Sequence, residues 1–237
     1  MNKPTALVTG GSRGIGRAII HRLLEDGYEV VNFSRRPPSD PLDGETFVAV
    51  DLADANAARE AVASLTARTE VLHLVNNAGM IKTASLEDLS PEDLSATMAL
   101  NLVAPAILAQ GVLPAMKARG YGRIVNIGSR AARGKAGRSA YGASKAALAG
   151  ITRTWALELA GHGITVNTVA PGPVATELFK ASNPDDAAQT VQLRAAIPVG
   201  RIGDPEEVAH AVAMFLDRRA GYITGQLLYV CGGMTVG

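Results

Sequence analysis

A tyrosine and a lysine stand four residues apart in the alanine-rich segment YGASKAALAGITRTWALELA, which begins at Tyr141. Positions four apart lie on one face of a helix, so the Tyr141 phenol and the Lys145 ammonium are expected side by side. A tyrosine keeps its proton up to a pH of about 10 unless a nearby cation stabilises its phenolate. Lys145 can supply that cation and make Tyr141 an acid or base; the alternative is an ordinary pair on a solvated helix face.

Length and composition indicate one domain, residues 1–237, with a substantial core. The 237 residues are 47% hydrophobic and 19% charged, and a chain of this size can bury a single core. The formal net charge of +1 gives no overall field for nucleic acid or an anionic membrane, so neither is expected as a partner. The apolar run near the N-terminus is too short for a signal peptide, and we expect a cytoplasmic protein.

Cysteine and histidine usage argues against a metal site. Cys231 is the only cysteine, which excludes an intrachain disulfide or a cluster of thiolates. The four histidines are scattered along the chain without the spacing of metal ligands. No metal is therefore expected.

The longest apolar stretch, residues 96–116, is long enough to resemble a membrane span. Asn101, Pro105, Gln110 and Pro114 interrupt it. A helix that is apolar on most sides is more simply buried between a sheet and a neighbouring subunit, which predicts an oligomer.

Short apolar or β-branched runs alternate with helical patterns along the whole chain. Strands are expected over residues 5–8, 28–33, 47–50, 71–75, 122–127, 164–169 and 226–230. Helices are expected over 17–27, 54–67, 96–116, 141–160 and 205–216. This alternation predicts an α/β fold: a Rossmann-like, doubly wound parallel sheet of about seven strands with helices on both faces.

The first expected strand runs into the glycine-rich segment TGGSRGIG, residues 9–16, and then into a helix. Glycines there let the backbone turn tightly and approach a diphosphate, whose charge is favoured at a helix N-terminus. No Gly-Lys-Ser/Thr sequence follows, which argues against a nucleoside triphosphate loop. A tight structural turn is the alternative.

The end of the second expected strand indicates which dinucleotide is bound. An acidic residue at this position accepts hydrogen bonds from the adenosine ribose, whereas arginine accommodates a 2′-phosphate. This chain has Arg35 and Arg36 there, with Arg13 in the glycine turn as a third donor. Because the planar guanidinium suits phosphate, we expect NADP(H) over NAD(H). Solvated loop charges are the alternative.

Polar or small residues close several other strands, at the edge where such sheets bind ligands. These ends are Asp51-Leu52, Asn76–Gly79, Gly128-Ser129 and the PGPVAT segment, 171–176. The segment that follows, 177–203, is long and mixed in polarity, as a substrate lid would be. A surface excursion with two short helices is the alternative.

In their order and spacing, TGGSRGIG, NNAG, Asn101, Ser129, YGASK and PGPVAT resemble the short-chain dehydrogenase/reductase family, and the resemblance covers nearly the whole chain. Within the family the chain looks most like the 3-oxoacyl-acyl-carrier-protein reductases. The resemblance implies that Tyr141 is the general acid in reduction and the base in the reverse reaction. It implies that Lys145 lowers the pKa of the tyrosine and binds the nicotinamide ribose, and that Ser129 holds the substrate oxygen. Asn101 would hold a helix distortion and a water.

The resemblance also implies a set of cofactor contacts. The diphosphate turn would be Gly10, Ser12, Arg13, Gly14, Ile15 and Gly16, and the adenine edge Asp51 and Leu52. The floor under the adenosine ribose would be Asn77, Ala78 and Gly79, and the nicotinamide side Pro171, Gly172, Val174 and Thr176. Tyr141 and Lys145 belong to both sets. The family further implies a homotetramer built through the helices of Asn101 and Tyr141.

Two features depart from the carrier-protein reductases. The segment between Ser129 and Tyr141 is one residue shorter, and it carries Arg130, Arg133, Lys135 and Arg138. A carboxylate or phosphate on the substrate would explain these charges, as would a solvated or interface loop. Where such reductases often have carrier-docking arginines, this chain has Gly120 and His162.

The leading hypothesis is an NADPH-dependent oxidoreductase that reduces a ketone or 3-oxoacyl group to a secondary alcohol. One alternative is a dehydrogenase of a secondary alcohol, sugar or cyclic diol. A non-catalytic dinucleotide-binding sensor is the alternative from another class, although a pure binder has no need of an acid beside a cation.

Overall fold

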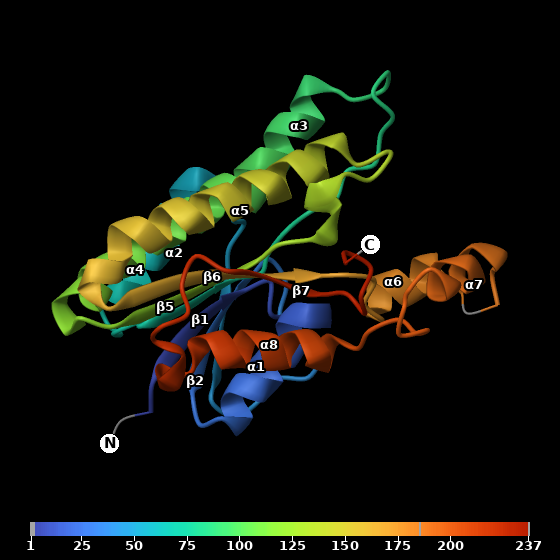
Figure 1. Cartoon of the computed structure of the whole chain (residues 1–237). Helices are drawn as coiled ribbons and strands as arrows, with labels where there is room; N and C mark the ends of the chain where they lie inside the picture. Colours follow the sequence, from blue (N-terminus) through green and yellow to red (C-terminus); the bar gives the residue numbers. More distant parts are fainter. Residues whose placement is uncertain (1–2, 185, 237) are drawn as a thin grey trace.

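Seven parallel strands form one sheet, in the order β3-β2-β1-β4-β5-β6-β7 (Figure 1). The computed structural model describes residues 3–184 and 186–236. Its strands are β1 (Thr5–Thr9), β2 (Glu29–Ser34), β3 (Glu45–Ala49), β4 (His73–Asn76), β5 (Gly122–Ile127), β6 (Ile164–Pro171) and β7 (Leu227–Val230). Because every pairing is parallel, all carboxyl ends meet at one edge. The predicted α/β fold with about seven parallel strands is confirmed.

The central strands are buried on both faces, which explains their apolar composition. Every residue of β4, β5 and β6 is buried, whereas the edge strands β3 and β7 are half-exposed. A parallel sheet covered on both sides selects such runs in place of an alternating pattern.

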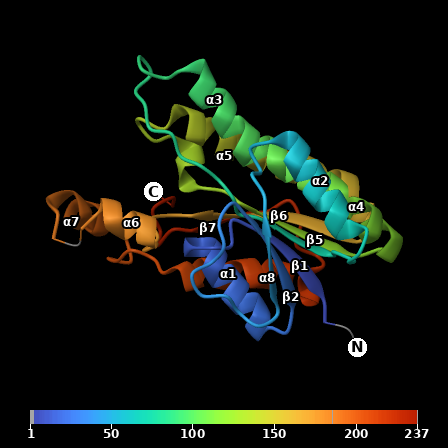
Figure 2. The ribbon, with the colours of Figure 1, turned by 180° about the vertical axis from the view of Figure 1, so that it is seen from behind.

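Helices cover the two faces as separate layers (Figures 1 and 2). One layer holds α1 (Gly14–Glu25) and α8 (Pro205–Leu216); the other holds α2 (Ala55–Thr66), α4 (Ala104–Arg119) and α5 (Ser139–Leu159). Each layer packs its own apolar cluster against the sheet. The active-site residues can therefore come only from strand ends and from helices that reach the carboxyl edge.

The helix expected over 96–116 is longer than predicted and is interrupted. It consists of α3 (Pro91–Met98), a π-helical turn (Ala99–Val103) and α4. The whole run, Pro91–Arg119, is long and apolar enough to cross a membrane by length and composition. Buried residues of α4, such as Ile107, Leu108 and Val112, belong to a core cluster against the sheet, which accounts for the apolar composition of this part.

Smaller differences from the predicted bounds have local causes. Helix α1 starts at Gly14, three residues earlier than expected, because the end of the glycine turn forms its first turn. Strand β4 starts at His73, two residues later than expected. The segment 177–203 forms α6 (Glu177–Ser182) and α7 (Ala188–Ala195), which extend beyond the end of β7 (Figure 1).

Helices α2 and α4 approach closely at Gly111, and this contact gives a stability test. A Cβ at Gly111 would lie 2.5 and 2.6 Å from the two γ-carbons of Val62. Gly111→Ala should therefore lower the free energy of unfolding by about 1–3 kcal/mol, as overpacking does, measured by denaturant unfolding. The control is Gly161→Ala, whose added carbon meets no atom within 4 Å. Equal stability of the two variants would contradict this packing.

Candidate active site

Three of the four predicted catalytic side chains line one hollow of about 190 Å³ at the carboxyl edge of the sheet. They are Ser129, Tyr141 and Lys145. The remaining lining residues come from the first residues of α1 and from the ends of β4, β5 and β6: Ile15, Asn77, Gly79, Ile81, Ile127, Gly128, Pro171 and Gly172. The topology thus gathers segments that are distant in sequence.

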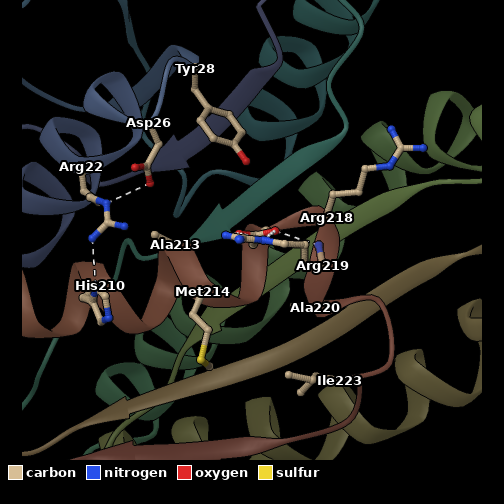
Figure 3. Close-up of a pocket in the computed structure, with 11 residues that line it drawn as sticks. Arg22, Asp26, Tyr28, His210, Ala213, Met214, Arg218, Arg219, Ala220 and Ile223 are labelled. Carbon is tan, nitrogen blue, oxygen red and sulfur yellow. Dashed lines mark hydrogen bonds and ion pairs between the residues drawn. The ribbon is translucent and has the colours of Figure 1, made fainter.

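A larger hollow, of about 680 Å³, lies at the opposite edge of the sheet (Figure 3). Most of its charged side chains pair with one another: Arg22 contacts Asp26 and His210, and Arg219 contacts Asp217. It contains none of the predicted site residues. Despite its size, it is therefore not the candidate site.

Lys145 is buried beside Tyr141 on α5. Its Nζ lies 5.9 Å from the centre of the tyrosine ring and donates a 2.6 Å hydrogen bond to the carbonyl oxygen of Ile127. A Cβ added at Gly79 would lie 3.6 Å from that Nζ. Burial disfavours the charged ammonium and lowers the pKa of Lys145 to about 8. The Lys145 ammonium therefore titrates near pH 8 and lies in a closely packed position.

The Tyr141 phenol keeps its proton at neutral pH in this environment. Burial raises the pKa of Tyr141, while a hydrogen bond with Ser129 and the nearby guanidinium of Arg138 act to lower the pKa. The raised pKa favours the protonated form, which is the form that donates a proton during reduction. The expected lowering of the Tyr141 pKa by Lys145 is therefore not found, because burial outweighs the opposing effects and these come from Ser129 and from Arg138, which was not among the predicted catalytic residues.

Asn101 lies in the π-helical turn, as the expected helix distortion requires. Its side chain is buried; Oδ1 accepts a 2.9 Å hydrogen bond from the backbone of Met80, and Nδ2 donates to the Met80 carbonyl and to Ser144 Oγ, both at 3.0 Å. The amide thereby ties the segment after Gly79 to α5. The π-helical turn directs the Asn101 side chain toward the place where the segment after Gly79 meets α5.

The NNAG segment is fixed to the glycine turn through Thr9. Thr9 Oγ1 accepts 2.9 Å hydrogen bonds from the backbone N–H groups of Asn77 and Ala78. The Asn77 side chain donates to the carbonyl oxygens of Thr9 and Gly10. The predicted diphosphate turn and the predicted ribose floor are thus one rigid unit.

Glycines in and around the turn are required by close approaches. Gly10 and Gly14 have φ of +67° and +57°, where a side chain is strained. A Cβ at Gly14 would lie 3.2 Å from Thr176 Cγ2, and a Cβ at Gly172 would lie 2.8 Å from the Cα of Cys231. Thr176, one of the residues expected on the nicotinamide side, therefore lies against the glycine turn, and Gly172 lies against Cys231.

Beneath the glycine turn lies a polar network that the sequence analysis missed. Asn32 Oδ1 accepts a 3.1 Å hydrogen bond from the Gly11 N–H, and its Nδ2 donates to Glu45 Oε1 at 2.8 Å. Glu45 also pairs with Arg17 at 2.7 Å, and Arg17 reaches Asp40. The signal for this network was an asparagine within the apolar run of residues 30–33 in strand β2.

The same network joins the glycine turn to the end of β2. Ser12 Oγ accepts from Asn32 Nδ2 at 3.3 Å and donates a 2.6 Å hydrogen bond to the Arg36 carbonyl oxygen. The position of Arg36 relative to the turn is therefore fixed by protein contacts alone.

The predicted 2′-phosphate residues Arg13, Arg35 and Arg36 are exposed. None of them is in an ion pair within residues 3–184 and 186–236. Asp51 is exposed and accepts from the Ala53 N–H at 3.0 Å, while Leu52 is buried. Free guanidinium groups at the end of β2, beside an open helix N-terminus, fit a phosphorylated dinucleotide.

Val174 is buried between the sheet and α8, and Pro171 ends β6 in the hollow. Among the described residues, no group of three or more His, Cys, Asp or Glu side chains could hold a metal ion.

The chain matches known proteins over nearly its full length. Residues 10–235 match the family described as enoyl-(acyl carrier protein) reductase. The 3-oxoacyl-acyl-carrier-protein reductase of Vibrio cholerae is 39% identical, with 97% of this chain and 96% of that protein covered. The acetoacetyl-CoA reductase of Shinella zoogloeoides is 37% identical, over 96% of this chain and 97% of that protein.

Solved structures are similar to this chain over nearly its full length as well. A structure described as an NAD(P)-dependent gluconate 5-dehydrogenase from Beutenbergia cavernae, with bound NADP, has a TM-score of 0.90 and is 37% identical, covering 99% of this chain and 97% of that one. A protein from a metagenomic library in complex with NADPH has a TM-score of 0.87 at 34% identity, covering 99% and 98%. With the Ser129, Tyr141 and Lys145 side chains gathered in one hollow, these matches show that the chain belongs to the short-chain dehydrogenase/reductase family.

Proposed function

We propose that this protein is an NADPH-dependent reductase that converts a ketone or 3-oxoacyl group into a secondary alcohol. The observation that carries the proposal is the single hollow at the carboxyl edge of the sheet. It holds a protonated phenol, a hydroxyl and a buried ammonium next to the glycine turn. These groups can position a carbonyl and deliver a proton to its oxygen.

In the proposed mechanism the bound dinucleotide supplies the hydride. The Ser129 hydroxyl holds the carbonyl oxygen, and the Tyr141 phenol donates its proton to that oxygen as charge develops there. The Lys145 ammonium stabilises the phenolate that remains and holds the ribose. Proton donation by a positioned acid contributes about 10² to 10⁴ in rate. Asn101 keeps this arrangement aligned through Met80 and Ser144.

NADPH is the proposed cofactor because the end of β2 presents cations and no acid. Arg35 and Arg36 are exposed there, with Arg13 in the turn, and the pyrophosphate would lie at the N-terminus of α1. The relatives whose descriptions mention bound NADP or NADPH support the same choice. Tyr141 and Lys145 would contact the nicotinamide ribose.

The two curated relatives named above support a 3-oxoacyl thioester as the carbonyl compound. The gluconate dehydrogenase neighbour supports the alternative, oxidation of a sugar or another secondary alcohol, by the same residues in reverse. We also propose that the substrate is anionic, since the loop after Ser129 is basic and has no acidic residue.

A cytoplasmic homotetramer is the proposed state of the protein. Leu157 on α5 and Val103 at the end of the π-helical turn are exposed, at 85% and 43%. Such apolar side chains on the helices of Tyr141 and Asn101 favour burial between subunits. The segment 177–203 is proposed to cover the substrate.

The test of the proposed function is NADPH oxidation with an acetoacetyl thioester by the wild type and by Tyr141→Phe. Removing the proton donor should lower kcat at least 10²-fold and leave the Kd for NADPH nearly unchanged, measured by fluorescence titration. Tyr222→Phe, a fully exposed tyrosine, is the control. Turnover by Tyr141→Phe at the wild-type rate would remove Tyr141 from the mechanism.

The pH dependence of kcat/KM should reflect the loss of a proton from the buried Lys145. Since burial lowers the pKa of Lys145 to about 8, its ammonium is present below that pH and is lost above it. The kcat/KM for NADPH, which reflects the free enzyme, should therefore fall as the pH rises through about 8. In Lys145→Arg, which stays charged, this descending limb should disappear. A limb at the same pH in the variant would assign it to another group.

The network under the glycine turn should matter for cofactor binding. Asn32→Ala removes the acceptor of the Gly11 N–H, and an unpaired buried donor costs about 1–3 kcal/mol. We expect the Kd for NADPH to rise about tenfold. Asn56→Ala, on the exposed start of α2, is the matched control. If both variants bind NADPH like the wild type, the network does not position the turn.

A further inference from the structure

The segment from Arg130 to Arg138, here called the basic loop, joins Ser129 to the start of α5. It contains Arg130, Arg133, Lys135 and Arg138 and no acidic residue. A surface loop of ordinary composition would intersperse charges of both signs. Its place, between two catalytic residues, makes its charge relevant to the substrate.

Backbone contacts hold the basic loop in one position relative to Tyr141. The Ser129 side chain accepts from the Ala131 N–H at 3.1 Å and caps a short 3-10 helix. Gly137 accepts a 3.2 Å hydrogen bond from Ala84, in the segment that follows β4. Arg138 accepts from the Gly142 N–H at 2.7 Å, which ties the loop to the first turn of α5.

Three of the four cations gather together. The pKa of Lys135 is lowered by partial burial and then by the charges of Arg138 and Arg130, so Lys135 lies near both arginines. Arg138 also acts on the pKa of Tyr141, which places its guanidinium close to the proton donor. The cluster therefore borders the reaction site.

This cluster has no anionic partner within the described residues. No ion pair there includes Arg130, Lys135 or Arg138. The Nε of Arg130 is buried without a hydrogen-bond partner, although buried polar groups nearly always have one. One bound anion would offset the repulsion between these cations and would accept a hydrogen bond from the buried Arg130 Nε.

Arg133 differs from the other three. Its Nη1 donates to the carbonyl oxygen of Thr235 near the C-terminus, and Arg133 is not among the groups that act on Lys135 or Tyr141. It carries the same charge in the same loop but is engaged elsewhere. Arg133 is therefore a matched control.

We propose that Arg130, Lys135 and Arg138 form a subsite for a carboxylate or phosphate group carried by the substrate. The inference rests on the proposed function and narrows it to anionic carbonyl compounds. The anionic group has two sources, a carboxylate on a short oxo acid or a phosphate on the carrier of an acyl thioester. Charge-assisted hydrogen bonds to such a group would orient the carbonyl toward Tyr141 and Ser129.

The experiment compares substrates in matched pairs with NADPH. One pair is 4-oxopentanoate and its methyl ester, and the other is acetoacetyl-CoA and the uncharged acetoacetyl-N-acetylcysteamine. Arg138→Gln and Lys135→Gln should raise the KM for a charged member roughly tenfold or more, with the KM for its uncharged partner unchanged. The pair that responds identifies carboxylate or phosphate as the group bound.

Arg133→Gln removes the same charge from the loop and should leave all four KM values near those of the wild type. Equal effects on charged and uncharged substrates, or an equal effect of Arg133→Gln, would overturn the subsite. Such results would leave the proposed function standing, because turnover of the uncharged substrates tests it separately.

A binding measurement makes the subsite testable without turnover. Isothermal titration of malonate and of inorganic phosphate into the protein saturated with NADPH should show binding by the wild type and by Arg133→Gln. Binding should be lost in Arg138→Gln and Lys135→Gln. Absence of binding by the wild type would overturn the subsite, even if carbonyl compounds are reduced.

Discussion

The burial of one ammonium group, that of Lys145, is the constraint on which the site depends. Burial lowers the pKa of Lys145, and its ammonium donates a hydrogen bond to the carbonyl oxygen of Ile127 at the end of β5. A buried cation held by a backbone dipole keeps its charge only in a narrow range of geometry. The absence of a side chain at Gly79 and the placement of α5 against β5 and β6 both serve that geometry. The Tyr141 phenol, one helical turn earlier on α5, is therefore held at a fixed distance from the Lys145 ammonium.

The cofactor side of the site is organised by hydrogen bonds that leave the ligand-facing groups free. Thr9 and Asn77 join two strand ends, and Asn32 with Glu45 supports the turn from below. Protein contacts satisfy the backbone on the inner side of the turn, whereas Arg35 and Arg36 face solvent. Such preorganisation lowers the entropy that binding a flexible dinucleotide would otherwise cost.

Sequence patterns predicted the sheet, the strand ends and the family, and these were confirmed. Residues on one helix face, such as Tyr141 and Lys145, could be paired from their spacing because helix geometry is local. Asn32 could not be assigned to the glycine turn, since its hydrogen bond to Gly11 depends on how distant segments pack. The bounds of β4 and α1 differed by two or three residues, because tertiary contacts determine where regular hydrogen bonding starts. The roles of the individual site residues stay predictions.

The π-helical turn at Ala99–Val103 has a consequence for how the chain tolerates insertions and deletions. An α-helix rotates by about 100° per residue, so the extra residue in a π turn offsets the faces of the helices on its two sides. Loss of one residue between Pro91 and Asn101 could be absorbed as a regular α-helix, yet it would rotate Asn101 away from Met80. The position required of Asn101 in the active site therefore constrains the number of residues in this segment.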